Sequence, residues 1–157
     1  MSTVMTAPPK AAEKKKPFVL KGVMQAPVTP LNDDFSVDYD RFAKMVDFHV
    51  RNGAPAIAWP HHKAESPNLT MDERKKGAEV MIKTVAGRVP VSVFVGSLSE
   101  EDSLDLATHA QKIGADMILT ISPYCRRPSQ EEIFRSITRI GSHTDLPVLT
   151  YNSPWRN

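Results

Sequence analysis

Residues 91–121 read VSVFVGSLSEEDSLDLATHAQKIGADMILTI, and this stretch decides the fold class. It begins with the apolar run 91–95, continues through an amphipathic segment, and ends in a second apolar run at 117–121. Ser99 opens the amphipathic segment and Gly114 closes it. Between them, apolar residues recur at helical spacing: Leu106, Ala107, Ala110 and Ile113. The stretch therefore predicts a strand, a helix with one buried face, and another strand.

The same pattern continues on both sides of this stretch. Three more amphipathic segments begin at a hydroxyl residue and stop at a glycine: Ser36 to Gly53, Thr70 to Gly87 and Ser129 to Gly141. Two of them have capping-box spacing, Thr70 with Glu73 and Ser129 with Glu132. The positions expected to be buried in the first two are Phe42, Met45, Val46, Val50, Ala78, Met81, Ile82 and Val85. We therefore expect four helices.

The remaining apolar runs flank these helices, at residues 23–28, 56–59 and 148–151. None of the five runs alternates with polar residues, which indicates strands buried on both faces, as parallel strands covered by helices are. A strand and helix unit recurs about every thirty residues. The pattern leaves two architectures open, an open doubly wound sheet and a closed barrel of eight strands.

Composition excludes several classes of function. A formal net charge of +2, with dispersed basic residues, argues against nucleic-acid binding. No apolar stretch is long enough to span a membrane. The single cysteine, Cys125, excludes an internal disulfide and suits a reducing cytoplasm. Residues 1–17 are rich in Ala, Pro and Lys, and we expect them to form a disordered leader rather than a secretory signal, with a transit peptide as the less favoured alternative.

Polar side chains gather where the predicted strands end, which is where parallel α/β folds carry their functional loops. The three loops are WPHHKAES (59–66), SPYCRRPSQEE (122–132) and YNSPWRN (151–157). His61, His62 and Glu65 could suggest a metal site, but adjacent histidines usually point apart, so we predict no metal. We also predict no cofactor.

Five segments carry a resemblance to a known family: GVMQAPVTPL (22–31), ESPNLTMDER (65–74), GRVPV (87–91), GADMILTISPY with RPSQEE (114–132), and LPVLTYNSP (146–154). The sequence resembles the dihydrodipicolinate synthase and N-acetylneuraminate lyase family of class I pyruvate aldolases. The resemblance runs in order from about Gly22 onward. It implies that residues 18–157 are the N-terminal part of a (β/α)8 barrel, about the first five strands and four helices.

The resemblance also implies an activity and an assembly. Members are usually tetramers of tight dimers, in which a lysine on the sixth strand forms a Schiff base with pyruvate. Tyr151 matches the tyrosine of the family's proton relay, and Arg156 matches the arginine that holds the substrate carboxylate. Tyr124 and Cys125 match a pair of tyrosines at the site rim and the dimer interface. The Schiff-base lysine has no counterpart among residues 1–157.

One family motif is replaced in this sequence. Typical members carry a G-[ST]-T-G-E loop that supplies hydroxyls and a carboxylate pocket, whereas residues 61–65 read HHKAE. Lys63 could attract a substrate carboxylate by charge, or serve as an unusual Schiff-base amine, and its alternative role is that of a solvated loop lysine. His62 could relay a proton near neutral pH. We expect this loop and Tyr151 to share one face of the fold.

Three interpretations of function remain open. The favoured one is the N-terminal part of a lyase or aldolase for a 2-oxo acid such as pyruvate, inactive alone and part of a longer gene product. A noncatalytic paralogue could instead bind and regulate a full-length family member. Altered chemistry could use His62, Lys63 and Tyr151. Because five strands cannot close an eight-stranded barrel, we also expect homo-oligomers or pairing with a chain that supplies the missing half.

Overall fold

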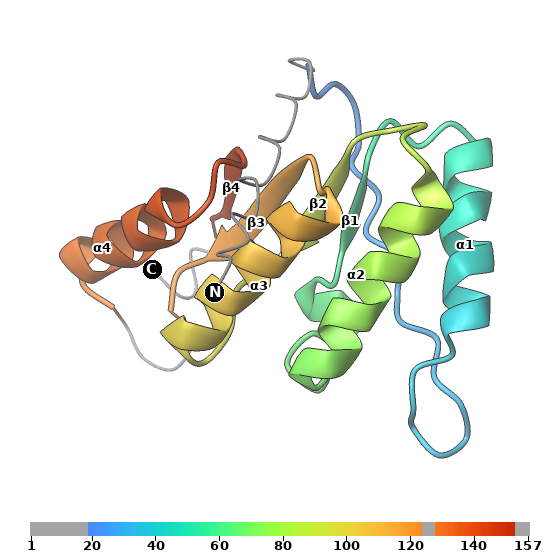
Figure 1. The fold of residues 1–157 in the computed structure, drawn as a ribbon, viewed down its shortest axis with the longest axis horizontal. Helices are drawn as coiled ribbons and strands as arrows, with labels where there is room; N and C mark the ends of the chain where they lie inside the picture. Colours follow the sequence, from blue (N-terminus) through green and yellow to red (C-terminus); the bar gives the residue numbers. More distant parts are fainter. Residues whose placement is uncertain (1–18, 124–127, 153–157) are drawn as a thin grey trace, which may run out of the picture.

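Strands and helices alternate along the chain in the computed structural model, which describes residues 19–123 and 128–152 (Figure 1). In chain order these elements are α1 (Tyr39–Arg51), β1 (Ile57–Trp59), the 3₁₀ turn η1 (His62–Ala64), α2 (Met71–Val85), β2 (Val91–Phe94), α3 (Glu100–Ile113), β3 (Met117–Ile121), α4 (Gln130–Ser142) and β4 (Val148–Tyr151). The predicted leader, residues 1–17, lies outside the described residues.

The strands form one parallel sheet in the order β1-β2-β3-β4, so each strand pairs with the next one in the chain. The helices follow the same order, with α1 beside α2, α2 beside α3 and α3 beside α4 (Figure 1). A doubly wound sheet reverses its strand order and carries helices on both faces. The sequential order observed here is that of a (β/α)8 barrel, and the described residues form part of one.

The two faces of the sheet have different neighbours. The main core lies between the sheet and the helices, and its buried members include Phe42, Val46, Ile57, Trp59, Met81, Val93, Leu106, Ile118 and Ile140. The opposite face carries a smaller cluster, Phe94, Leu119 and Ile121, with Met24 and Leu149 packed against it. Because side chains alternate along a strand, the sequence places neighbouring residues such as Val93 and Phe94 on opposite faces. We call the face that carries Phe94 the inner face.

Both predicted capping boxes are present, at Thr70 with Glu73 and at Ser129 with Glu132. The start of α1 was predicted at Ser36, and this is wrong, because the side chain of Asp38 caps the helix. Ser36 instead donates its hydroxyl to Asp34 Oδ1 at 2.6 Å, while the chain stays extended through Val37. No helix in the described part of the chain is long and apolar enough to cross a bilayer.

The first predicted strand, residues 23–28, does not form as predicted. It makes a single parallel bridge, between Gln25 and Ile57, with Gln25 N donating to Ala56 O at 2.9 Å. Pro27 lacks an amide hydrogen and cannot extend this ladder. Val23 is 70% exposed and Val28 57% exposed, so the expected burial of this run on both faces is also wrong. The described residues therefore contain four regular parallel strands rather than five.

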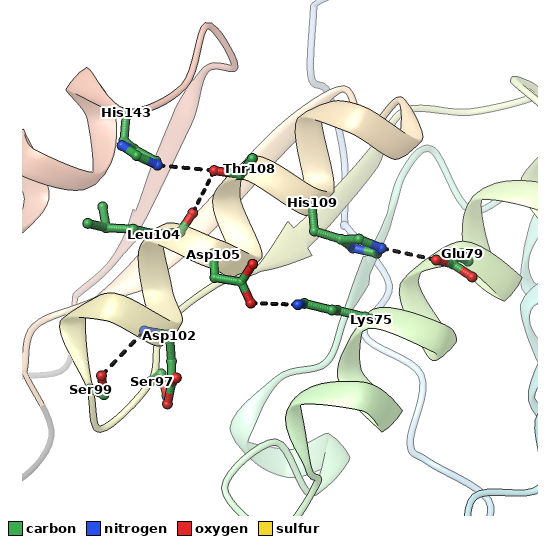
Figure 2. Close-up of polar contacts among 10 residues, drawn as sticks. All are labelled: Lys75, Glu79, Ser97, Ser99, Asp102, Leu104, Asp105, Thr108, His109 and His143. Atoms are coloured by element: carbon green, nitrogen blue, oxygen red, sulfur yellow. Dashed lines mark hydrogen bonds and ion pairs between the residues drawn. The ribbon is translucent and has the colours of Figure 1, made fainter.

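Polar contacts join the helices on the side away from the sheet (Figure 2). Lys75 Nζ lies 2.5 Å from Asp105 Oδ2, and His109 Nε2 lies 3.0 Å from Glu79 Oε1, so an ion pair and a histidine–carboxylate hydrogen bond connect α2 with α3. Thr108 Oγ1 lies 3.0 Å from His143 Nε2 and connects α3 to the end of α4. Exposed pairs of this kind contribute little stability each, so the apolar core must supply most of it.

Helix α2 packs so tightly on β1 at Gly77 that one added methyl group should change the stability of the fold. A Cβ atom at Gly77 would lie 2.2 Å from Trp59 Cη2. Trp59 is fully buried and its ring centroid lies 4.8 Å from that of Phe42, so it cannot move aside freely. We expect Gly77→Ala to lower the free energy of unfolding by about 1–3 kcal/mol through overpacking, measured by urea unfolding at one fixed protein concentration.

Gly141→Ala is the matched control for this variant. A Cβ there would meet Val148 Cγ2 at 3.6 Å, an ordinary contact, within helix α4. Alanine is favoured over glycine in helices by about 1 kcal/mol, so this variant should keep or raise the stability. Equal stabilities of the two variants would contradict the packing argument.

Candidate active site at the carboxyl-terminal edge of the sheet

The four strands are parallel, so their carboxyl ends meet at one edge of the sheet. Residues 60–66 follow β1, Gly96 follows β2, Ser122 follows β3, and Tyr151 ends β4. Two of the three polar loops identified in the sequence are therefore present, at least in part, at this edge. The third, after β3, is described only to Pro123 and again from Pro128.

Buried hydrogen bonds hold the loop after β1. Trp59 Nε1 donates to Thr29 Oγ1 at 2.9 Å, and the Thr29 hydroxyl donates to the backbone oxygen of Ala64 at 2.6 Å. Ala64 is 1% exposed and Thr29 7% exposed, so water competes little with these bonds. The loop then turns sharply at Glu65, which has a φ of 65°. As a result, η1 has a defined position against the strand that precedes it.

Three aromatic rings meet on the inner face at this edge, and we call His61, Phe94 and Tyr151 the aromatic cluster. The His61 ring stacks on Phe94, with centroids 5.5 Å apart and planes 26° apart. It meets Tyr151 edge to face, with centroids 6.0 Å apart and planes 82° apart. The His62 ring also contacts Phe94, with the two ring centroids 5.7 Å apart. The loop after β1 is thereby in contact with β2 and β4.

Burial affects the ionisation of His61. Removal from water disfavours the imidazolium, and this desolvation lowers the pKa of His61 below its usual 6.5. At pH 7 the ring is therefore a neutral imidazole, with one nitrogen that accepts a hydrogen bond and one that donates. Such a group can take a proton from a neighbour without first losing one.

Arg74 supports the cluster from helix α2. Its side chain is 4% exposed, and Nη2 donates to the backbone oxygens of Phe94, at 3.0 Å, and Gly96, at 2.9 Å. Its Cζ atom also lies 5.8 Å from the centroid of the Phe94 ring. This buried cation therefore fixes the end of β2, and with it the ring on which both histidines pack.

Comparison with known proteins identifies the family. The model of the dihydrodipicolinate synthetase family matches residues 19–157. The chain belongs to this family. A 4-hydroxy-tetrahydrodipicolinate synthase of Gluconacetobacter diazotrophicus is 37% identical over 139 residues, which cover 88% of this chain and 47% of that protein. The chain thus spans about half the length of the curated relatives that it matches, and corresponds to their N-terminal part.

Solved structures of the family agree with the fold. YagE, a prophage protein from E. coli K12 whose structure is in complex with pyruvate, matches with a TM-score of 0.84 and 28% identity, covering 88% of this chain and 47% of that one. N-acetylneuraminate lyase from Mycoplasma synoviae matches with a TM-score of 0.79 and 27% identity, covering 83% of this chain and 46% of that one. The four strands and four helices therefore correspond to the N-terminal half of the family's barrel.

The predicted site residues of this family member fall into two groups. Tyr151, His62 and Lys63 lie at the carboxyl-terminal edge, and of these Tyr151 belongs to the aromatic cluster and His62 contacts Phe94. Tyr151 is 46% exposed, and Lys63 is also exposed. Tyr124, Cys125 and Arg156 lie outside the described residues.

The sequence suggested His61 only as a possible metal ligand, together with His62 and Glu65. The structure places it, rather than His62 or Lys63, against Tyr151. The two adjacent histidines were expected to point apart, but both of their rings pack on Phe94. Among the described residues, no group of three His, Cys, Asp or Glu side chains could hold a metal ion. Glu65, weighed as a metal ligand, accepts a hydrogen bond from Asn68 Nδ2 at 2.7 Å.

Proposed function

We propose that this chain supplies the N-terminal half of the active site of a class I lyase or aldolase that acts on a 2-oxo acid such as pyruvate. The observation that carries the proposal is the contact between Tyr151, at the end of β4, and His61, in the loop after β1. Residues 90 positions apart in the chain thus meet at the edge where enzymes with this fold carry their chemistry. Family membership supports the same reaction class.

In the proposed reaction, a lysine amine adds to the ketone carbon of the substrate and expels its oxygen as water. Tyr151 supplies a proton to the departing oxygen and later recovers one. A phenol suits this task because it both donates and accepts a hydrogen bond. Lys63 and Arg156 attract the substrate carboxylate by charge, and His62, which is next to Lys63 in the chain, can relay a proton. The amine itself comes from a lysine outside residues 1–157.

The chain should also associate with another polypeptide. Among the described residues, β4 pairs with β3 alone, and Val23 and Val28 are exposed near the opposite edge of the sheet. Unpaired strand edges and open apolar surface favour pairing with another polypeptide. We propose that the partner is a second copy or a chain that supplies the rest of the barrel.

Reductive trapping tests the reaction class. Two proteins are compared: the 157-residue chain, and a completed protein in which the C-terminal half of the Gluconacetobacter diazotrophicus relative follows residue 157. With pyruvate and borohydride, the chain alone should keep its mass, whereas the completed protein should gain one stable pyruvate adduct, measured by mass spectrometry.

Lys63→Ala in both proteins is the control. It should leave the adduct of the completed protein in place. An adduct on the chain alone that disappears in Lys63→Ala would instead make Lys63 the nucleophile. A completed protein that traps no 2-oxo acid would refute the catalytic proposal and favour the noncatalytic paralogue.

A further inference from the structure

The hydroxyl of Thr29 joins the core of β1 to the loop that follows this strand. It accepts a hydrogen bond from Trp59 Nε1 at 2.9 Å and donates one to the backbone oxygen of Ala64 at 2.6 Å. A hydroxyl has one hydrogen to donate, and the indole is itself a donor, so the hydrogen of Thr29 is directed to Ala64. We call Trp59, Thr29 and Ala64 the hydrogen-bond chain.

The surrounding fold fixes the start of this chain. The indole of Trp59 is fully buried and lies against helix α2 at Gly77, where a Cβ atom would come within 2.2 Å of Cη2. Thr29 precedes Pro30, which restricts Thr29 to extended backbone. The backbone oxygen of Pro30 in turn accepts a hydrogen bond from Asp38 N at 2.9 Å. The position of the Thr29 hydroxyl is therefore set by the core.

Through Ala64, the hydrogen-bond chain also fixes the backbone of Lys63. Ala64 is the last residue of η1, and its amide donates to the backbone oxygen of His61 at 2.8 Å, which closes the turn. Ser66 N donates to the same oxygen at 3.3 Å. Lys63 lies inside this turn and is exposed, and no carboxylate among the described residues forms an ion pair with it. Its ammonium is thus available to an anionic ligand.

We propose that Thr29 is a positioning residue for the binding of the substrate carboxylate by Lys63. The inference rests on the proposed function, in which Lys63 attracts that carboxylate by charge. Thr29 does not touch the substrate. It acts through the backbone oxygen of Ala64, which holds η1 against β1 and limits the positions that the Lys63 side chain can reach. Because a loop that is ordered in advance loses less conformational freedom on binding, the hydroxyl contributes to affinity rather than to the chemical step.

Thr29→Val in the completed protein tests the role of the hydroxyl. Valine has nearly the same shape, but it leaves Trp59 Nε1 without its acceptor and the backbone oxygen of Ala64 without its donor. We expect KM for pyruvate to rise about 10-fold with kcat unchanged, the pattern of a lost contribution to binding that is equal in the ground state and the transition state. Thr29→Ser keeps the hydroxyl and should have the parent's KM. An unchanged KM in Thr29→Val would overturn the proposal.

A core variant separates positioning from a general loss of stability. Val46 is fully buried on α1, in the same core as Trp59, and Val46→Ala leaves the three residues of the hydrogen-bond chain in place. This variant should lower the unfolding temperature through the cavity that it creates, but it should keep the parent's KM. A rise in KM as large as that of Thr29→Val would mean that overall stability, and not the hydroxyl, controls substrate binding.

Limited proteolysis reports on the loop without turnover. Endoproteinase Lys-C cleaves after lysine, so cleavage of the 157-residue chain between Lys63 and Ala64 measures the opening of η1. Cleavage after Lys112, in the last turn of α3, is the internal reference. The ratio of the two initial rates should rise about 10-fold in Thr29→Val, because a buried hydrogen bond that holds η1 is lost. It should keep the parent's value in Thr29→Ser and Val46→Ala.

The two measurements fail in different ways. An unchanged cleavage ratio in Thr29→Val refutes the claim that Thr29 holds the loop. A raised ratio with an unchanged KM limits Thr29 to a structural role and overturns the proposal. A completed protein without turnover refutes the proposed function, and with it the role in carboxylate binding, whereas the cleavage ratio still decides whether Thr29 holds η1.

Discussion

Tyr151→Phe is expected to lower the kcat of the completed protein by about 1,000- to 10,000-fold, the upper part of the range for loss of a group that transfers protons. The change removes only the hydroxyl. The ring can still meet His61 edge to face, so the arrangement of the aromatic cluster should survive. Tyr151 is 46% exposed, and its hydroxyl is not required by the core, so the unfolding transition should move little.

Thr150→Val is the matched control for Tyr151→Phe. Thr150 precedes Tyr151 on the same strand and is exposed, but it faces the opposite side of the sheet because side chains alternate. Thr150→Val, like Tyr151→Phe, removes a single hydroxyl, and it should leave kcat unchanged. Steady-state kinetics with pyruvate gives kcat for each variant, and a thermal melt shows whether the variant is folded. Together they distinguish loss of proton transfer from unfolding. Equal turnover in the Tyr151→Phe protein and its parent would show that the phenol has no part in the reaction.

The fold could be predicted from sequence because its signals are local. A capping box such as Thr70 with Glu73 needs only four consecutive residues, and a buried helix face such as that of Met81 and Val85 needs only helical spacing. Parallel strands were indicated by uninterrupted apolar runs. The choice between a barrel and a doubly wound sheet could not be made from periodicity, because it depends on the strand order and on which face each helix covers.

The site was less predictable because its arrangement depends on distant contacts. Which of the two adjacent histidines faces Tyr151 is set by the path of the loop, and that path depends on Thr29, more than 30 residues earlier. The first predicted strand failed for a related reason. Residues 23–28 are apolar, as a strand requires, but Pro27 restricts their pairing with a neighbouring strand. Nothing in the described residues covers Val23 or Val28.

Arg74→Ala is expected to cause the largest loss of stability, about 3–5 kcal/mol in the free energy of unfolding. Arg74 is 4% exposed and makes two charge-assisted hydrogen bonds to backbone oxygens of the β2 end. Bonds to charged groups contribute about 1.5–3 kcal/mol each, and alanine also leaves a cavity beside Phe94. The carbonyl oxygens of Phe94 and Gly96 remain when the guanidinium is removed, and both lose a charged donor.

Arg135→Ala provides the comparison, because that side chain is 74% exposed and its partner, Glu131, lies on the same helix. Exposed pairs of this kind contribute little, so its stability should stay within about 0.5 kcal/mol of the parent. Urea unfolding at one protein concentration gives both values. Loss of Arg74 should also affect the site, because both histidine rings pack on Phe94. The His61 resonance should therefore shift in Arg74→Ala and stay unchanged in Arg135→Ala. A small loss of stability in Arg74→Ala, comparable to that in Arg135→Ala, would mean that the buried guanidinium is replaceable by water and does not hold the end of β2.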